Sequence, residues 1–215
     1  AVTGELYAEF SHPKVMDVRI GISAKLDFEQ IREVWSGIVS AAREHGYKEV
    51  SLDLVPSPNG LSVSISSVGE TSLLMARRRP AGKSMDLICV TDNLGAAYLG
   101  FQVLERERRK FEQSADAQAQ PALDTYKNLV GAYLKPQINP QIIGQMEDAE
   151  IMPSYGYLVT RGLADAVRRL VRDSGLGAKI YVDKFRHDFQ TFDVIGHLAK
   201  PDVGAVIVTP DGVEL

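Results

Sequence analysis

The sequence predicts an α/β protein, in which a mixed-sheet N-terminal half is followed by a smaller α/β C-terminal half. Three observations support this fold class. Residues 15–26 alternate apolar and polar side chains, as a half-buried strand does. Residues 27–46 repeat apolar side chains at helical spacing, and residues 161–175 do so again far along the chain.

The N-terminal half predicts strands and helices in alternation. Asp27 and Gln30 form a capping box that begins the first predicted helix, and Gly46 ends it. Trp35 lies on the apolar side of this helix, so we expect it to be largely buried. In chain order the predicted elements are strands at 5–10 and 15–26, a helix at 27–46, a strand at 48–55, a helix at 68–79, a strand at 84–90 and a helix at 93–113.

The C-terminal half is predicted to start after a small, polar, alanine-rich linker at 114–124. This gives a domain over 1–113 and a second α/β domain over 125–215. The second domain is predicted to contain helices at 125–135 and 161–175, strands at 155–160 and 178–183, and a final strand or hairpin at 204–215.

Composition and charge narrow the functional classes. The net charge of −4 argues against nucleic-acid binding, and no apolar run is long enough to cross a membrane. The chain has one cysteine, Cys89, placed inside a predicted buried strand. An unpaired thiol and the absence of an export signal at the N-terminus predict a cytoplasmic location.

The segment at 75–95 contains Gly82-Lys83-Ser84, which invites comparison with a phosphate-binding loop. Such a loop runs from a strand into a helix and has an earlier glycine. Here the predicted order is helix to strand and the earlier glycine is absent. We therefore predict that Lys83 and Ser84 do not bind a nucleotide phosphate.

The order of predicted elements across 5–112 resembles a STAS-type domain, the family named for sulfate transporters and anti-sigma antagonists. The segment 18–55 is similar to the family's opening strand, its turn into the first helix and the next strand. The segment 64–92 is similar to the part where a serine-bearing turn begins the second helix. The resemblance implies a STAS-like N-terminal half that acts through protein partners.

In that family the serine at the start of the second helix is a phosphorylation switch, and an aspartate precedes it. Ser66 and Ser67 match the serine, whereas Ser64 and Ile65 stand in place of the aspartate. The alternative is that Ser67 only caps the predicted helix together with Glu70, a contribution of about 1 kcal/mol.

A polar cluster in the last fifth of the chain is the candidate catalytic or metal site. Imidazole and carboxylate groups bind divalent metals and act as general acids and bases. A helix over 191–199 would bring Asp193 and His197 onto one face, although no known metal-binding spacing is present. The candidates are His187, Asp188, Asp193 and His197.

A basic stripe on the C-terminal helix is a candidate for binding an anionic ligand or an acidic partner. It consists of Arg168, Arg169 and Arg172. A solvated helix face explains the same three residues equally well.

Three hypotheses for function follow. The first is a non-catalytic regulatory or interaction protein built on the STAS-like module, with a protein partner and with a homo-oligomer left open. The second is an enzyme with a His/Asp site in the C-terminal half, with or without a metal. The third is a structural subunit of a larger assembly, in which the irregular segment 136–153 wraps a neighbour. No substrate or cofactor is indicated by the sequence.

Overall fold

The computed structural model describes residues 1–91, 94–113 and 123–181, and these form parts of two compact units. The first unit combines 1–81 with 138–158, and the second contains the described parts of 82–137 and of 159 onward. The elements are α1 (Val2–Ala8), β1 (Ser11–Ile22), α2 (Phe28–Glu44), β2 (Glu49–Pro56), β3 (Ser62–Thr71), α3 (Leu73–Arg78), α4 (Ala96–Gln113), the 3-10 turn η1 (Asp124–Tyr126), α5 (Lys127–Leu134), α6 (Ile142–Asp148) and α7 (Leu163–Ser174).

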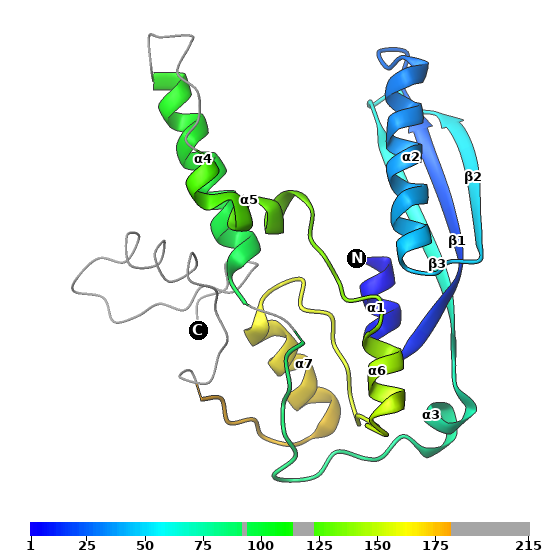
Figure 1. Cartoon of the computed structure of the whole chain (residues 1–215), viewed down its shortest axis with the longest axis vertical. Coiled ribbons are helices and arrows are strands. Elements are labelled where there is room, and N and C mark those ends of the chain that lie inside the picture. Colours follow the sequence, from blue (N-terminus) through cyan, green and yellow to red (C-terminus); the bar gives the residue numbers. More distant parts are fainter. Residues whose placement is uncertain (92–93, 114–122, 182–215) are drawn as a thin grey trace. The chain divides into compact units, whose positions relative to one another are not determined.

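The first unit is built on a three-stranded mixed sheet in the order β2-β1-β3 (Figure 1). The central strand β1 pairs in parallel with β2 and antiparallel with β3. The parallel pair requires a crossover, and α2 provides it. An α/β fold with a small mixed sheet, as the sequence predicted, is therefore confirmed.

Helix α2 begins where the sequence predicts. The Asp27 carboxylate accepts from the Gln30 amide at 2.8 Å, and the Gln30 side chain accepts from the Asp27 amide at 3.2 Å. Its apolar side packs on a core whose centre is Val18 and Ile20 of β1, both essentially inaccessible to water. Trp35 packs against this core but is only partly buried, so the prediction of a largely buried indole was too strong.

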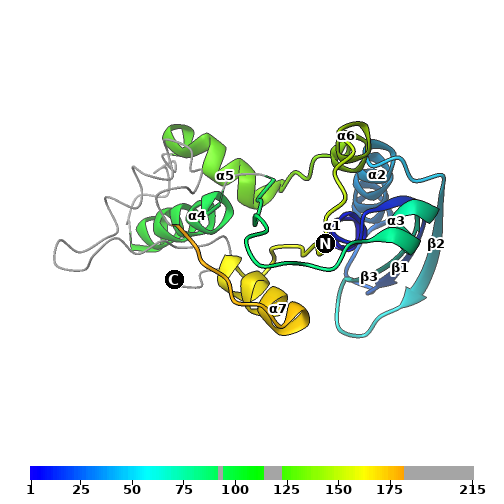
Figure 2. The ribbon, with the colours of Figure 1, turned by 90° about the horizontal axis from the view of Figure 1, so that it is seen from below.

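The predicted strand at 5–10 is wrong, because these residues belong mostly to helix α1. Tyr7 and Phe10 are three positions apart and pack with Ile143 of α6 in a second small core. Phe10 ends the helical segment with a φ of 55°, and β1 begins at Ser11, between the two predicted strands. Figure 2 shows α1 and α2 on the same face of the sheet.

The predicted helix at 68–79 starts too early. The alternating pattern of β3 continues to Thr71, which pairs with Ser11, and α3 begins only at Leu73. Its cap is Ser72, whose hydroxyl accepts from the Met75 amide at 3.2 Å. Ladder hydrogen bonds to β1 therefore prevail over the local capping signal at Ser67.

The predicted strand at 84–90 is also absent. The segment has no regular structure, Met85 is 93% exposed, and the Cys89 thiol is exposed rather than buried.

The second unit contains the α4–α5 hairpin, whose core consists of Leu99, Val103, Leu129 and Val130. The two helices approach so closely at Gly100 that an added Cβ would lie 2.0 Å from the Leu129 carbonyl oxygen. Helix α7 matches the predicted C-terminal helix and ends at Gly175, which has a φ of 68°. Most of the predicted linker lies outside the described residues, and the domain boundary placed there stays a prediction. No helix in the described part of the chain is long and apolar enough to cross a membrane.

Candidate functional site

The face of the sheet opposite α2 carries a concentration of polar side chains. Alternate residues of β1 point to opposite faces, so Asp17 and Arg19 lie opposite the core residues Val18 and Ile20. The strand register places polar residues of β2 and β3 beside them. We call this surface the polar sheet face, and its residues are all exposed: Asp17, Arg19, Ser51, Asp53, Ser62, Ser64 and Ser66.

Two cross-strand contacts organise the polar sheet face. The Arg19 guanidinium donates from Nε to the Asp53 carboxylate at 2.7 Å, and the Ser51 hydroxyl donates to the Asp17 carboxylate at 2.5 Å. The Arg19 and Asp53 side chains are 66% and 54% exposed, so water screens their attraction strongly. Breaking this ion pair therefore costs little free energy, so both side chains are available to bind a ligand.

The chemistry of this face suits a phosphate accompanied by a hard cation. A guanidinium and several hydroxyls can donate to phosphate oxygens, and carboxylate oxygens are ligands for Mg²⁺. Within the described ranges, no group of three or more His, Cys, Asp or Glu side chains could hold a metal ion. A cation at this face would thus need the oxygens of its substrate as well.

A second polar network lies on the α2 side of the sheet. The Tyr47 hydroxyl lies 3.1 Å from the Thr3 hydroxyl and 2.5 Å from the Ser67 hydroxyl. Nearby, the Tyr7 hydroxyl lies 3.0 Å from His45 Nδ1. Burial raises the pKa of Tyr7 to about 12 and lowers the pKa of His45. This network ties α1 to the end of α2 and to β3, which is a structural role.

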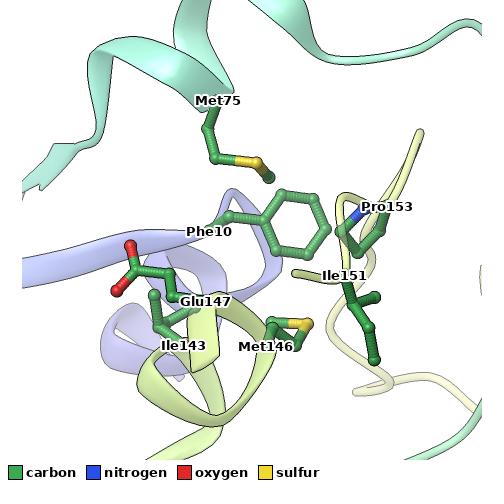
Figure 3. A pocket seen from close by; sticks show the side chains of 7 residues that line it. All are labelled: Phe10, Met75, Ile143, Met146, Glu147, Ile151 and Pro153. Atoms are coloured by element: carbon green, nitrogen blue, oxygen red, sulfur yellow. The ribbon is translucent and has the colours of Figure 1, made fainter. Parts of the chain in front are cut away.

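A shallow hollow in the first unit is lined mostly by apolar side chains (Figure 3). The Phe10 ring lies between Met75 and Met146, and Glu147 supplies the one charged group in its lining. His12 Nε2 lies 3.3 Å from the Glu147 carboxylate at the surface. A binding site needs several convergent polar groups, and this hollow does not offer them.

The predicted regulatory serines are not at the start of a helix. Both lie inside β3, with Ser66 on the polar sheet face and Ser67 bonded to Tyr47 on the opposite face. The predicted capping role of Ser67 is therefore wrong.

The predicted basic stripe lies on α7, where carboxylates accompany its arginines. Arg168 and Arg169 both contact Asp165, at 3.0 and 3.2 Å, and Arg172 contacts Asp173 at 2.9 Å. Local ion pairs thus offset much of the positive charge that an anionic ligand would need.

The predicted His/Asp cluster cannot be placed. His187, Asp188, Asp193 and His197 lie outside the described residues. Lys83 and Ser84 are described, and they lie after α3 in a stretch without helix or strand; the next helix, α4, begins only at Ala96. The Lys83 amide there donates to the Asp86 carboxylate at 2.7 Å.

Sequence reasoning missed the polar sheet face, although its signal was present. In the stretch 16–20, apolar residues alternate with Asp17 and Arg19, which is the pattern of a strand with one solvated face. The partners on β2 and β3 could be assigned only once the strand register was known.

No protein-family profile and no curated protein matches this chain. Its backbone does resemble solved structures of thiamine monophosphate kinase. The enzyme from Aquifex aeolicus is 17% identical with a TM-score of 0.70, over 92% of this chain and 62% of that one. The enzyme from Stenotrophomonas maltophilia is 17% identical with a TM-score of 0.70, over 93% and 58%.

The hydrogenase maturation protein HypE from E. coli is also similar, at 11% identity and a TM-score of 0.58, over 92% of this chain and 56% of that one. The chain has the PurM-like fold. It spans about three fifths of the length of these proteins.

The PurM-like fold overturns the predicted resemblance to STAS-type domains. It also overturns the hypothesis of a non-catalytic regulatory protein built on such a module. The STAS prediction rested on the order of elements, which many α/β folds share. It required a helix after Ser67, where the chain instead continues as the antiparallel strand β3.

Proposed function

We propose that this chain is part of an enzyme that binds a nucleoside triphosphate and transfers its terminal phosphoryl group to a small substrate. The observation that carries this proposal is the PurM-like fold over 92% of the chain, shared with thiamine monophosphate kinases. A related structure, 16% identical with a TM-score of 0.64, was solved in complex with AMPPCP and TMP. AMPPCP is an analogue of ATP, and TMP is a phosphorylated small molecule.

The polar sheet face is the part of this chain that we assign to the nucleotide phosphates. Catalysis of phosphoryl transfer depends mainly on positioning and on neutralising negative charge. Arg19 would bind phosphate oxygens, and the carboxylates of Asp17 and Asp53 would hold Mg²⁺ jointly with those oxygens. The chain spans about three fifths of the kinases, so the activity of the whole protein belongs to the proposal.

A second candidate function is that of a maturation factor that works with a protein partner. It rests on HypE, which was solved both alone and in a complex with HypF, at TM-scores of 0.58 and 0.60. The two candidates differ in what they need. The first binds nucleotide and a small acceptor by itself, whereas the second is active only with its partner protein.

The test is calorimetric titration of the purified chain with AMPPCP in the presence of Mg²⁺. We expect saturable binding that Asp53→Asn and Arg19→Ala each weaken at least about tenfold, which corresponds to about 1.4 kcal/mol. Glu33→Gln is the matched control, because it removes a charge from the exposed side of α2. Absence of binding at millimolar AMPPCP, with circular dichroism showing a folded chain, would refute the proposal.

The predicted C-terminal cluster enters the same experiment. His187→Ala and His197→Ala should leave AMPPCP binding unchanged and lower the rate of transfer from ATP if these imidazoles act on the acceptor. Equal transfer rates in both variants and in the unmodified chain would remove the cluster from the candidate site.

A further inference from the structure

Helix α3, which follows β3 in Figure 1, presents two leucines and two arginines to solvent. Leu73 and Leu74 are 71% and 52% exposed, and Arg77 and Arg78 are exposed as well. Side chains four positions apart lie on the same side of a helix. Arg77 therefore lies one turn beyond Leu73, and Arg78 lies one turn beyond Leu74. We call the surface formed by these four side chains the α3 face.

Contacts on the opposite side of α3 fix this outward orientation. Met75 packs against the small core around Phe10, as Figure 3 shows. The Arg79 guanidinium lies 4.9 Å from the centre of the Phe10 ring, and its Nε donates to the Ser154 carbonyl at 2.7 Å. Met75 and Arg79 are themselves four positions apart, so they hold one side of the helix against the first unit. The α3 face consequently cannot bury its leucines by turning inward.

The α3 face carries positive charge that nearby carboxylates do not neutralise. The stretch 71–85 contains four basic residues and no aspartate or glutamate. In the part of the chain that the structure describes, neither Arg77 nor Arg78 has a carboxylate within ion-pair distance. The preceding carboxylate, Glu70, is bonded to Lys14 at 2.8 Å. Arginine is enriched at protein interfaces, so its combination with exposed leucines indicates a docking surface.

We propose that the α3 face binds a partner protein whose surface carries carboxylates around an apolar patch. A carboxylate fits the planar guanidinium group through two parallel hydrogen bonds, and the leucines contact the apolar patch. An anionic membrane is the less suitable occupant. The chain has a net charge of −4, so a uniformly negative surface repels it as a whole, whereas a protein can place its carboxylates only where Arg77 and Arg78 lie. This docking surface does not depend on the proposed phosphoryl transfer, and its test uses no nucleotide.

The first experiment uses random peptides of about 16 residues, roughly four helical turns, displayed on phage. Pools are selected on the full chain and on the double variant Arg77→Glu/Arg78→Glu. We expect the peptides that bind only the unmodified chain to be rich in aspartate, glutamate and leucine. The control Lys25→Glu/Lys48→Glu changes the net charge equally at exposed lysines elsewhere in the first unit, and it should retain these peptides. Circular dichroism should show the same fold for all three proteins.

The second experiment separates the contributions of charge and of apolar contact. One retained peptide is titrated calorimetrically into the chain at increasing concentrations of sodium chloride. Arg77→Gln/Arg78→Gln should raise Kd at least about tenfold and remove most of its dependence on salt. Leu73→Ala/Leu74→Ala should raise Kd by a similar factor and leave the dependence on salt in place, because the arginines are still present.

Three outcomes would overturn the proposal. In the first, the glutamate variant retains the same peptides as the unmodified chain, or the peptides that it loses are not acidic. In the second, the unmodified chain sediments with phosphatidylglycerol vesicles and the glutamate variant does not, which would assign the α3 face to an anionic membrane. In the third, the glutamate variant differs in molar mass by light scattering, which would mean that a second copy of this chain covers the α3 face.

Discussion

Arg19 and Asp53 face each other across β1 and β2, with Nε and Oδ2 2.7 Å apart on the uncovered face of the sheet. Because both side chains are more than half exposed, the pair contributes little to folding. We expect a double-mutant cycle of Arg19→Ala and Asp53→Asn, measured by urea unfolding, to give a coupling energy below about 1 kcal/mol. A larger coupling would mean that the pair is structural and not free to bind a ligand.

The close approach of α4 and α5 should make two glycines respond oppositely to the same substitution. Gly100→Ala places a methyl group 2.0 Å from the Leu129 carbonyl, so we expect a loss of about 1–3 kcal/mol in the free energy of unfolding. Gly131→Ala on α5 meets no atom within 4 Å and should stabilise the protein by about 0.5–1 kcal/mol. Urea unfolding of both variants checks the pair, and equal effects would contradict the described helix contact.

The capping box of α2 can be tested with two substitutions at one position. Asp27→Ala removes the acceptor for the Gln30 amide and should cost about 1 kcal/mol. Asp27→Asn keeps an acceptor oxygen and should recover most of that loss. Thermal unfolding followed by circular dichroism measures both, and an unaffected Asp27→Ala variant would show that α2 is held by packing alone.

His45 should make stability depend on pH in mildly acidic solution. Burial lowers its pKa from the ordinary 6.5, and its ring lies beside the Tyr7 hydroxyl. The folded state therefore binds a proton less readily than the unfolded state. The stability that neutral His45 contributes is therefore fully present above pH 6.5, and it is lost as the pH falls through the lowered pKa.

The variant His45→Asn separates this effect from other titrations. Asn keeps a hydrogen-bonding oxygen for Tyr7 but does not titrate. Urea unfolding is measured at pH values from about 7.5 to about 5, which span the ordinary pKa of histidine. The free energy of unfolding should fall less steeply with decreasing pH for the variant than for the unmodified protein. Identical curves for the two proteins would assign the decline to other groups.

The elements that the sequence predicts correctly are those whose signals are local. The capping box at Asp27 and the glycine at 175 act within one helical turn, and α2 and α7 have the expected positions. The predictions for short segments were wrong because contacts with residues distant in the sequence determine the secondary structure there. Residues 2–8 are helical where Tyr7 meets Ile143, and residues 68–71 are extended because β1 pairs with them.

The candidate site could likewise be predicted only as far as local signals reach. Alternation in β1 indicates that Asp17 and Arg19 share a face, but only the register brings Asp53 and Ser51 beside them. Sequence reasoning looked instead for dense clusters along the chain, which led to the histidines near 190. A site assembled across strands has no such density in the sequence.

The first unit is interrupted in the sequence, and this has a consequence for synthesis. Its sheet and α2 are complete by residue 81, whereas α6, which buries Tyr7 and Phe10, lies beyond the whole of 82–137. A ribosome adds about 5–20 residues each second, so these aromatic side chains wait for seconds before Ile143 emerges. During that interval Tyr7 and Phe10 lack the α6 side of their core, which makes this stage of translation the point at which a chaperone would act.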